Sequence, residues 1–190
     1  LREMQHRVKN NFQLILASIS IQKRRYSAGE VHRALDHIAS RINAISLAHH
    51  QLSIRAHVQI VKVSDYIRAL CSTIRNQVEN IEIDIESHDI ELTIDRAVTL
   101  GLILNEVATN SIKHAFGEDG GRISVRLVTG VGYGEARLTI ADNGRGMPKT
   151  LSGGSGLKLV QSLARQIGGT IDQRSSSSGT STSLTFPAIS

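Results

Sequence analysis

The segment "LILNEVATNSIKHAF", residues 102–116, decides the fold of this chain. Its apolar residues recur with the period of a helix, which predicts a helix from about Asp95 to Phe116. At about 100° per residue, its polar side chains share one side of that helix. They are Glu106, Asn110, Lys113 and His114. Such a stripe fits either a solvated helix face or one side of a binding site.

The first two of these residues are i and i+4 neighbours, so Glu106 and Asn110 present a carboxylate and a carboxamide side by side. Both groups supply oxygen ligands suited to Mg²⁺ or to an ordered water. Lys113, one turn further on, can reach a phosphate group. The stripe therefore makes this helix a candidate metal and phosphate site.

A strand-like segment further along the chain ends in "DNGRGMP", residues 142–148. Asp142 stands at the strand end, where it can accept a hydrogen bond from an exocyclic amine. Gly144 and Gly146 follow it, and glycines let backbone approach a ligand closely. We therefore expect this loop to line the same site.

A second glycine-rich segment, "GGSGLKLVQSLARQIGG", covers residues 153–169. It places Gly154 and Gly156, followed by Leu157, at the start of a predicted helix. Helix N-termini bind phosphates through their free N–H groups and the helix dipole. One Gly-x-Gly is a weak signal, but three motifs in this order are not.

Together these motifs resemble the nucleotide-binding domain shared by gyrase, Hsp90, histidine kinases and MutL, the GHKL or Bergerat type. "NEVATNSIKHAF" resembles its N box, "DNGRGMP" its first glycine box and "GSGL" its second. "GTSTSLTFP", residues 179–187, resembles the terminal strand whose threonine, here Thr180, helps to hold the adenine-site water and aspartate. The resemblance implies ATP and Mg²⁺ as ligands, with Asn110 as a metal ligand and His114 at the base.

The first fifty residues have a different pattern, that of two helices. Apolar residues recur at spacings of three and four in both segments, and Ser27 with Glu30 can form a capping box at the start of the second. The second segment carries a heptad seam. Two helices alone bury their apolar faces poorly, so the pattern predicts a homodimer that forms a four-helix bundle. The seam consists of Val31, Leu35, Ile38, Ile42, Ile45, His49 and Leu52.

"HRVKNN", residues 6–11, opens the first helix. Followed by this nucleotide domain, it resembles the HRxxN type of sensor histidine kinase, which is often grouped with the HWE kinases. The resemblance implies that His6 is the phospho-accepting residue. Asn10, one turn later, can orient a water for dephosphorylation of a partner aspartate, and Glu3 is a candidate general base for His6.

The resemblance thus predicts a helical hairpin over 1–55 and an α+β sandwich over 56–190. It implies a cytoplasmic sensor histidine kinase, with a response-regulator receiver domain as its partner and an upstream sensor domain in a longer protein. Three alternatives remain: a net phosphatase acting through Asn10, a dimeric adaptor that binds ATP without catalysis, and a serine kinase of the anti-sigma type.

Composition agrees with a globular domain and argues against nucleic acid as a partner. Hydrophobic residues make up 40% of the chain and aromatic residues 3%, and the net charge is +5. The basic residues are scattered, and few aromatic side chains are available to stack on bases. The single cysteine, Cys71, excludes an internal disulfide and is predicted to be packed in a helix at 63–78.

Overall fold

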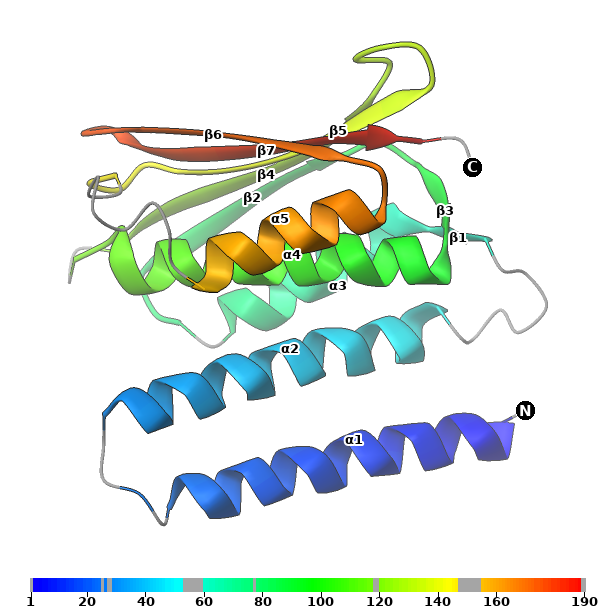
Figure 1. Ribbon diagram of the computed structural model, residues 1–190, viewed down its shortest axis with the longest axis vertical. Coiled ribbons are helices and arrows are strands. Elements are labelled where there is room, and N and C mark those ends of the chain that lie inside the picture. The colour runs from blue at the N-terminus through cyan, green and yellow to red at the C-terminus, as the bar shows by residue number, and fades with distance from the viewer. Residues whose placement is uncertain are drawn as a thin grey trace.

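The computed structural model describes residues 2–24, 26, 29–52, 60–76, 78–117, 120–146 and 155–188. It begins with two long helices, α1 (Arg2–Lys23) and α2 (Glu30–Leu52), which lie side by side as a hairpin (Figure 1). Ser27 of the expected capping box lies outside the described residues. α2 begins at Glu30, the other member of that box.

The rest of the chain forms an α+β unit of two sheets and three helices. A five-stranded sheet has the order β2-β4-β5-β7-β6, in which β2 and β4 are parallel and the other pairs antiparallel. A small antiparallel sheet pairs β1 with β3. The strands are β1 (Ile60–Lys62), β2 (Ile81–Ser87), β3 (Glu91–Thr93), β4 (Gly121–Thr129), β5 (Glu135–Asp142), β6 (Thr170–Ser176) and β7 (Gly179–Pro187). The helices are α3 (Val63–Arg75), α4 (Ile94–His114) and α5 (Ser155–Gln166).

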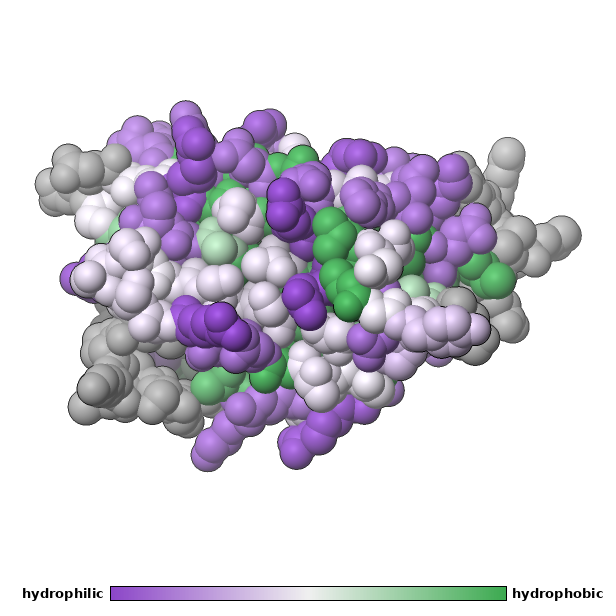
Figure 2. Space-filling model, turned by 90° about the horizontal axis from the view of Figure 1, so that it is seen from above, coloured by the Kyte–Doolittle hydropathy of each residue, from purple (hydrophilic) through white to green (hydrophobic). Residues whose placement is uncertain are grey.

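The three helices cover one face of the larger sheet and leave the other face open (Figure 1). In the central strands side chains alternate between the two faces, as the pleat requires, so one set is buried under the helices. The open face is largely hydrophilic (Figure 2). Cross-strand ion pairs such as Arg122–Glu82 at 2.8 Å and Arg126–Glu86 at 2.7 Å lie on it.

The core between helices and sheet is aliphatic, as the scarcity of aromatic residues requires. Leu100, Ile103 and Leu104 of α4 are fully buried and belong to one cluster with residues of β4, β5 and β7 such as Leu138. Cys71 is 1% exposed, as predicted, and burial raises the pKa of its thiol to about 12. A thiol so buried and so weakly acidic is not a nucleophile near neutral pH.

The hairpin packs on the α+β unit through α2, so α2 lies between α1 and α4 (Figure 1). Ala44 of α2 belongs to the common core, and the hydroxyl of the fully buried Tyr66 donates a hydrogen bond of 3.2 Å to its carbonyl. Within a single chain the heptad seam is only partly covered, because Val31 and Ile38 are 45% and 43% exposed, and its burial in a homodimer stays a prediction. A boundary between 55 and 56 stays a prediction.

Some local details could not be read from the sequence pattern. Ser64 does not cap α3, which begins after Lys62 without a side-chain cap, but donates a hydrogen bond of 2.6 Å to Asp89. The segment "SSSSGTS", residues 175–181, contains the tight turn of the hairpin that joins β6 to β7, and the rest of it extends the two strands. The short strands β1 and β3 were missed, since three residues are too few to show a period.

Candidate nucleotide-binding site

Asp142 ends β5 in the centre of the sheet and is held by three hydrogen bonds. The backbone N–H groups of Gly144 and Thr180 donate to its Oδ1 at 3.0 and 3.1 Å, and the Ser111 hydroxyl donates to Oδ2 at 2.8 Å. The side chain is 8% exposed. Three donors on two oxygens hold the Asp142 carboxylate in one orientation, with its oxygens available as acceptors.

Asp142 lines a pocket between α4, α5 and the sheet. The pocket has about 380 Å³ of empty space and is partly open to solvent. Four predicted site residues line it, namely Asp142, Asn110, Leu157 and Thr180. Sequence reasoning did not single out the other lining residues, which are Val107, Ser111, Val160, Gln173 and Thr182. The apolar members suit a flat base, while the carboxylate suits an amine on its edge.

Ser111 and Gln173 had only weak signals in the sequence. Ser111 stands beside Asn110 in the same motif, but a serine inside a helix is most often a solvated or small packed residue. Gln173 lies on β6, where its amide donates to Thr182 at 3.0 Å. Only the pairing of β6 with β7 brings Gln173 to the pocket.

The predicted glycines sit where backbone comes close to other groups. Gly146 has a φ of +74°, a left-handed conformation, and an added Cβ there would collide with the Ser176 carbonyl. A Cβ on Gly156 would lie 3.1 Å from the Asn110 amide nitrogen and 3.7 Å from Oε2 of Glu106. The start of α5, Asn110 and Glu106 therefore meet at one point. Gly154 lies outside the described residues.

Lys113 and His114 do not line the pocket, and both are exposed. The His114 carbonyl accepts a hydrogen bond of 2.9 Å from Arg145. Two predictions therefore remain: that His114 contacts the base and that Lys113 contacts a phosphate. Burial lowers the pKa of Lys113, an effect that the charges of Asp36 and Glu106 oppose.

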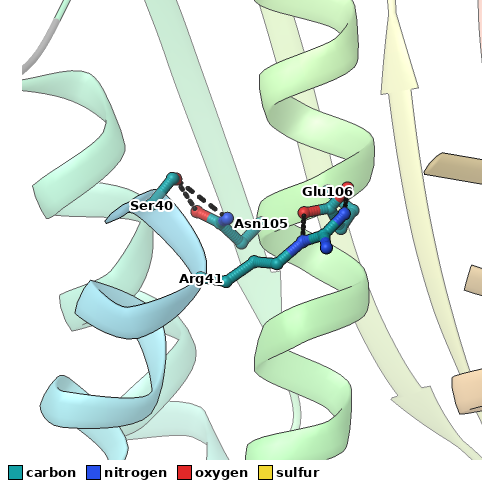
Figure 3. A network of polar contacts seen from close by, with 4 residues as sticks. All are labelled: Ser40, Arg41, Asn105 and Glu106. Atoms are coloured by element: carbon teal, nitrogen blue, oxygen red, sulfur yellow. Dashed lines mark hydrogen bonds and ion pairs between the residues drawn. The ribbon is translucent and has the colours of Figure 1, made fainter. Parts of the chain in front are cut away.

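Glu106 is not part of a solvated stripe, since it is 1% exposed and paired with a residue of the hairpin (Figure 3). Arg41 of α2 donates from Nε to Oε1 at 2.6 Å and from an Nη2 group to Oε2 at 3.0 Å. The hydrogen bond to Glu106 raises the pKa of Arg41. Beside it, Ser40 and Asn105 exchange hydrogen bonds of 3.0 and 3.1 Å.

No group of three or more His, Cys, Asp or Glu side chains that could hold a metal lies among the described residues. A nucleotide-bound Mg²⁺ does not require one, because phosphates and water supply most of its ligands. The Asn110 and Glu106 side chains, which converge at the start of α5, fit one or two protein ligands of such an ion. The residues present therefore fit Mg²⁺ bound together with a triphosphate.

Of the predicted acceptor and water-positioning residues on α1, His6 has no described side chain, and Asn10 is exposed. Residues i and i+4 share a helix face, so Asn10 lies on the face of His6. Glu3 has no described side chain either. No helix in the described parts of the chain is long and apolar enough to cross a membrane.

Comparison with known families decides the type of domain. Residues 95–190 match the family model of histidine kinase-, DNA gyrase B- and HSP90-like ATPases, and residues 3–78 match a histidine kinase model. This chain belongs to the histidine kinases. Its C-terminal half is an ATP-binding domain of the GHKL type, as the motifs predicted.

Individual histidine kinases are also similar to this chain in sequence or in structure. Blue-light-activated histidine kinase 2 of Erythrobacter litoralis is 29% identical over 98% of this chain, and the chain spans 56% of it. Sensor histidine kinase PdtaS of Mycobacterium tuberculosis is 29% identical over 92% of the chain, which spans 36% of it. The solved histidine kinase domain of an Erythrobacter litoralis blue-light-activated kinase has a TM-score of 0.73 at 25% identity, covering 98% of this chain and 90% of that one.

Proposed function

We propose that this histidine kinase chain is the catalytic core of a two-component sensor, which phosphorylates His6 from ATP and passes the phosphoryl group to an aspartate of a response-regulator receiver domain. A ring nitrogen of His6 attacks the γ-phosphorus, the bond from that phosphorus to the bridging oxygen breaks, and ADP leaves. The imidazole gives up its proton. An upstream sensor domain, a cytoplasmic location and a homodimer through residues 1–55 belong to the same proposal.

The observation that carries the proposal is the Asp142 carboxylate, fixed by three donors at the wall of a partly apolar pocket. An adenine amine donates hydrogen bonds, and an ionised carboxylate only accepts them, so the pair is complementary. A guanine presents a carbonyl at the corresponding edge and would meet that carboxylate with repulsion. The site therefore suits ATP better than GTP.

The remaining site residues position the triphosphate. Asn110, with Glu106 when its carboxylate is available, would hold Mg²⁺, which neutralises charge on the phosphates. Gly156 at the start of α5 lies close to Asn110 and Glu106, and N–H groups at a helix N-terminus can donate hydrogen bonds to phosphate oxygens. Phosphoryl transfer depends mainly on such positioning and charge stabilisation.

The proposal is tested by incubation with γ-labelled ATP, followed by acid or base treatment. We expect a base-stable, acid-labile label that disappears in His6→Ala and persists in His88→Ala, a matched control at an exposed histidine that follows β2. ATP binding should persist in both variants. An acid-stable, base-labile label would instead support a serine kinase, and binding without any label would support an adaptor.

A second candidate function, net dephosphorylation of the receiver, is favoured by one observation. Asn10 is exposed on the helix face of His6, where a carboxamide can bind a water beside a receiver's acyl phosphate. The same helix face would then serve both reactions.

A further inference from the structure

The carboxylate of Glu106 is held at both oxygens by a cation from the hairpin. The Arg41 guanidinium forms a two-pronged pair with it at 2.6 and 3.0 Å, while the carboxylate itself is 1% exposed (Figure 3). Such a pair is geometrically specific and strong for a buried carboxylate. In this arrangement Glu106 has little capacity left for a metal ion or a water.

The pair lies at the point where the proposed metal site would form. Oε2, which accepts from Arg41, is also the Glu106 oxygen that lies near Gly156, where the Asn110 amide lies close as well. The guanidinium therefore supplies the positive charge that a divalent cation would otherwise bring to this carboxylate.

Arg41 acts here as part of a contact between two helices and not as an isolated surface residue. Ser40 is hydrogen-bonded to Asn105, and Tyr66 donates to the Ala44 carbonyl one turn further along α2. These contacts hold α2 against α4 and α3, and α1, which carries His6, lies beyond α2 (Figure 1). In this arrangement α2 separates the helix of the acceptor from the nucleotide domain.

We propose that Arg41 and Mg²⁺ compete for Glu106, so that α2 docked on α4 holds the kinase in a resting state and binding of Mg²⁺ with ATP favours release of α2. A buried carboxylate without a partner is costly, but exchange of one cation for another keeps it neutralised throughout. Release of α2 also frees the hairpin to present His6 to a nucleotide domain. This inference rests on the proposed function.

The first test measures how much Mg²⁺ is needed for half-maximal binding of a fluorescent ATP analogue. In Arg41→Ala we expect that concentration to fall by about fivefold or more, the low end of coupling between linked sites. Arg41→Lys, which keeps the charge but lacks the two-pronged geometry, should give an intermediate value. Lys23→Ala is the control, because it removes a hairpin cation paired with Asp36 at 2.6 Å and should leave the value unchanged.

The second test needs no variant and therefore stands even if Arg41→Ala fails to fold. Amide hydrogen exchange in residues 37–45 of the unaltered protein should speed up at least severalfold with ATP plus Mg²⁺, and not with ATP plus a chelator. Unchanged exchange, or a Mg²⁺ requirement that does not differ between wild type, Arg41→Lys and Lys23→Ala, would overturn the competition. Absence of ATP binding in the wild type would overturn the proposed function as well.

Discussion

The hydroxyl of Ser111 donates a hydrogen bond of 2.8 Å to Oδ2 of Asp142, which joins α4 to the end of β5 inside the pocket. The other carboxylate oxygen is held by backbone, so Ser111 provides the one side-chain contact among the described hydrogen bonds of Asp142. A hydrogen bond to a charged group contributes about 1.5–3 kcal/mol.

We therefore expect Ser111→Ala to weaken ATP binding by about tenfold, which corresponds to about 1.4 kcal/mol. The Asp142 carboxylate would keep its charge but lose the contact that fixes its rotation. Calorimetric titration with ATP measures this. Thr73→Val is the matched control. The Thr73 hydroxyl donates to the Ala69 carbonyl of its own helix, and Thr73 does not line the pocket, so this substitution should leave the affinity unchanged.

Asp142→Asn should abolish measurable ATP binding while leaving the fold intact. The new carbonyl oxygen can still accept from the N–H groups of Gly144 and Thr180, and the Ser111 hydroxyl can turn to accept from the new amide. That amide then points a donor at the donor amine of adenine. Thermal unfolding within a few degrees of wild type, together with loss of binding, is the expected pair of results; retained affinity would contradict the assignment of Asp142 to the base.

Much of this site could be predicted from the sequence because its parts lie within short local motifs. Asn110, Asp142, Leu157 and Thr180 each belong to a motif of a few residues, and all four line one pocket. The longer helices were also predicted, since they are long enough to show their period.

The rest could not be predicted because it depends on contacts between distant segments. Arg41 reaches Glu106 across 65 positions of chain, and nothing near Arg41 in sequence marks it. The heptad seam of α2 predicted a surface for contact with a second chain, whereas the side chains that pack on the α+β unit of the same chain include Ser40, Arg41 and Ala44. Small and polar residues at such an interface have no periodic signal.

His37 predicts a pH dependence of stability. Burial, followed by the positive charge of Lys113, lowers its pKa below the ordinary value of 6.5. The unfolded chain then binds a proton more readily than the native one, so native stability falls as the pH drops below about 6.5 and is restored above it. His37→Gln should flatten this part of the profile, seen as a smaller change in the urea midpoint between pH 7.5 and 5.5 than in wild type. An unaltered pH dependence would mean that a group other than His37 causes the change in stability.

Residues 1–55 should form a homodimer. Leu14 of α1 is 68% exposed, and Ile21 and Val31 are 54% and 45% exposed, so the hairpin keeps apolar surface that its own chain does not cover. Light scattering should give twice the chain mass at tens of micromolar. Val31→Lys and Ile38→Lys together should produce a monomer, whereas Tyr133→Lys, a fully exposed site on the β4–β5 turn, should not. A monomeric wild type would contradict the expected bundle.

Asn10 should affect removal of phosphate from the receiver more than phosphorylation of His6. It is exposed one turn from His6, so a receiver docked on that helix face would bring its acyl phosphate near both residues. The Asn10 carboxamide can accept a hydrogen bond from an attacking water and donate one to it. Without Asn10, the acid–base groups of the receiver alone would orient that water poorly. We expect Asn10→Ala to slow dephosphorylation of a phosphorylated partner receiver by about tenfold or more, roughly 1.4 kcal/mol of barrier, with less than about twofold change in His6 labelling.

The control is Asn43→Ala, which changes an exposed asparagine of α2. The reverse result, a loss of labelling with normal dephosphorylation, would mean that Asn10 orients His6 for attack on ATP, and no change in either rate would make it an ordinary surface residue.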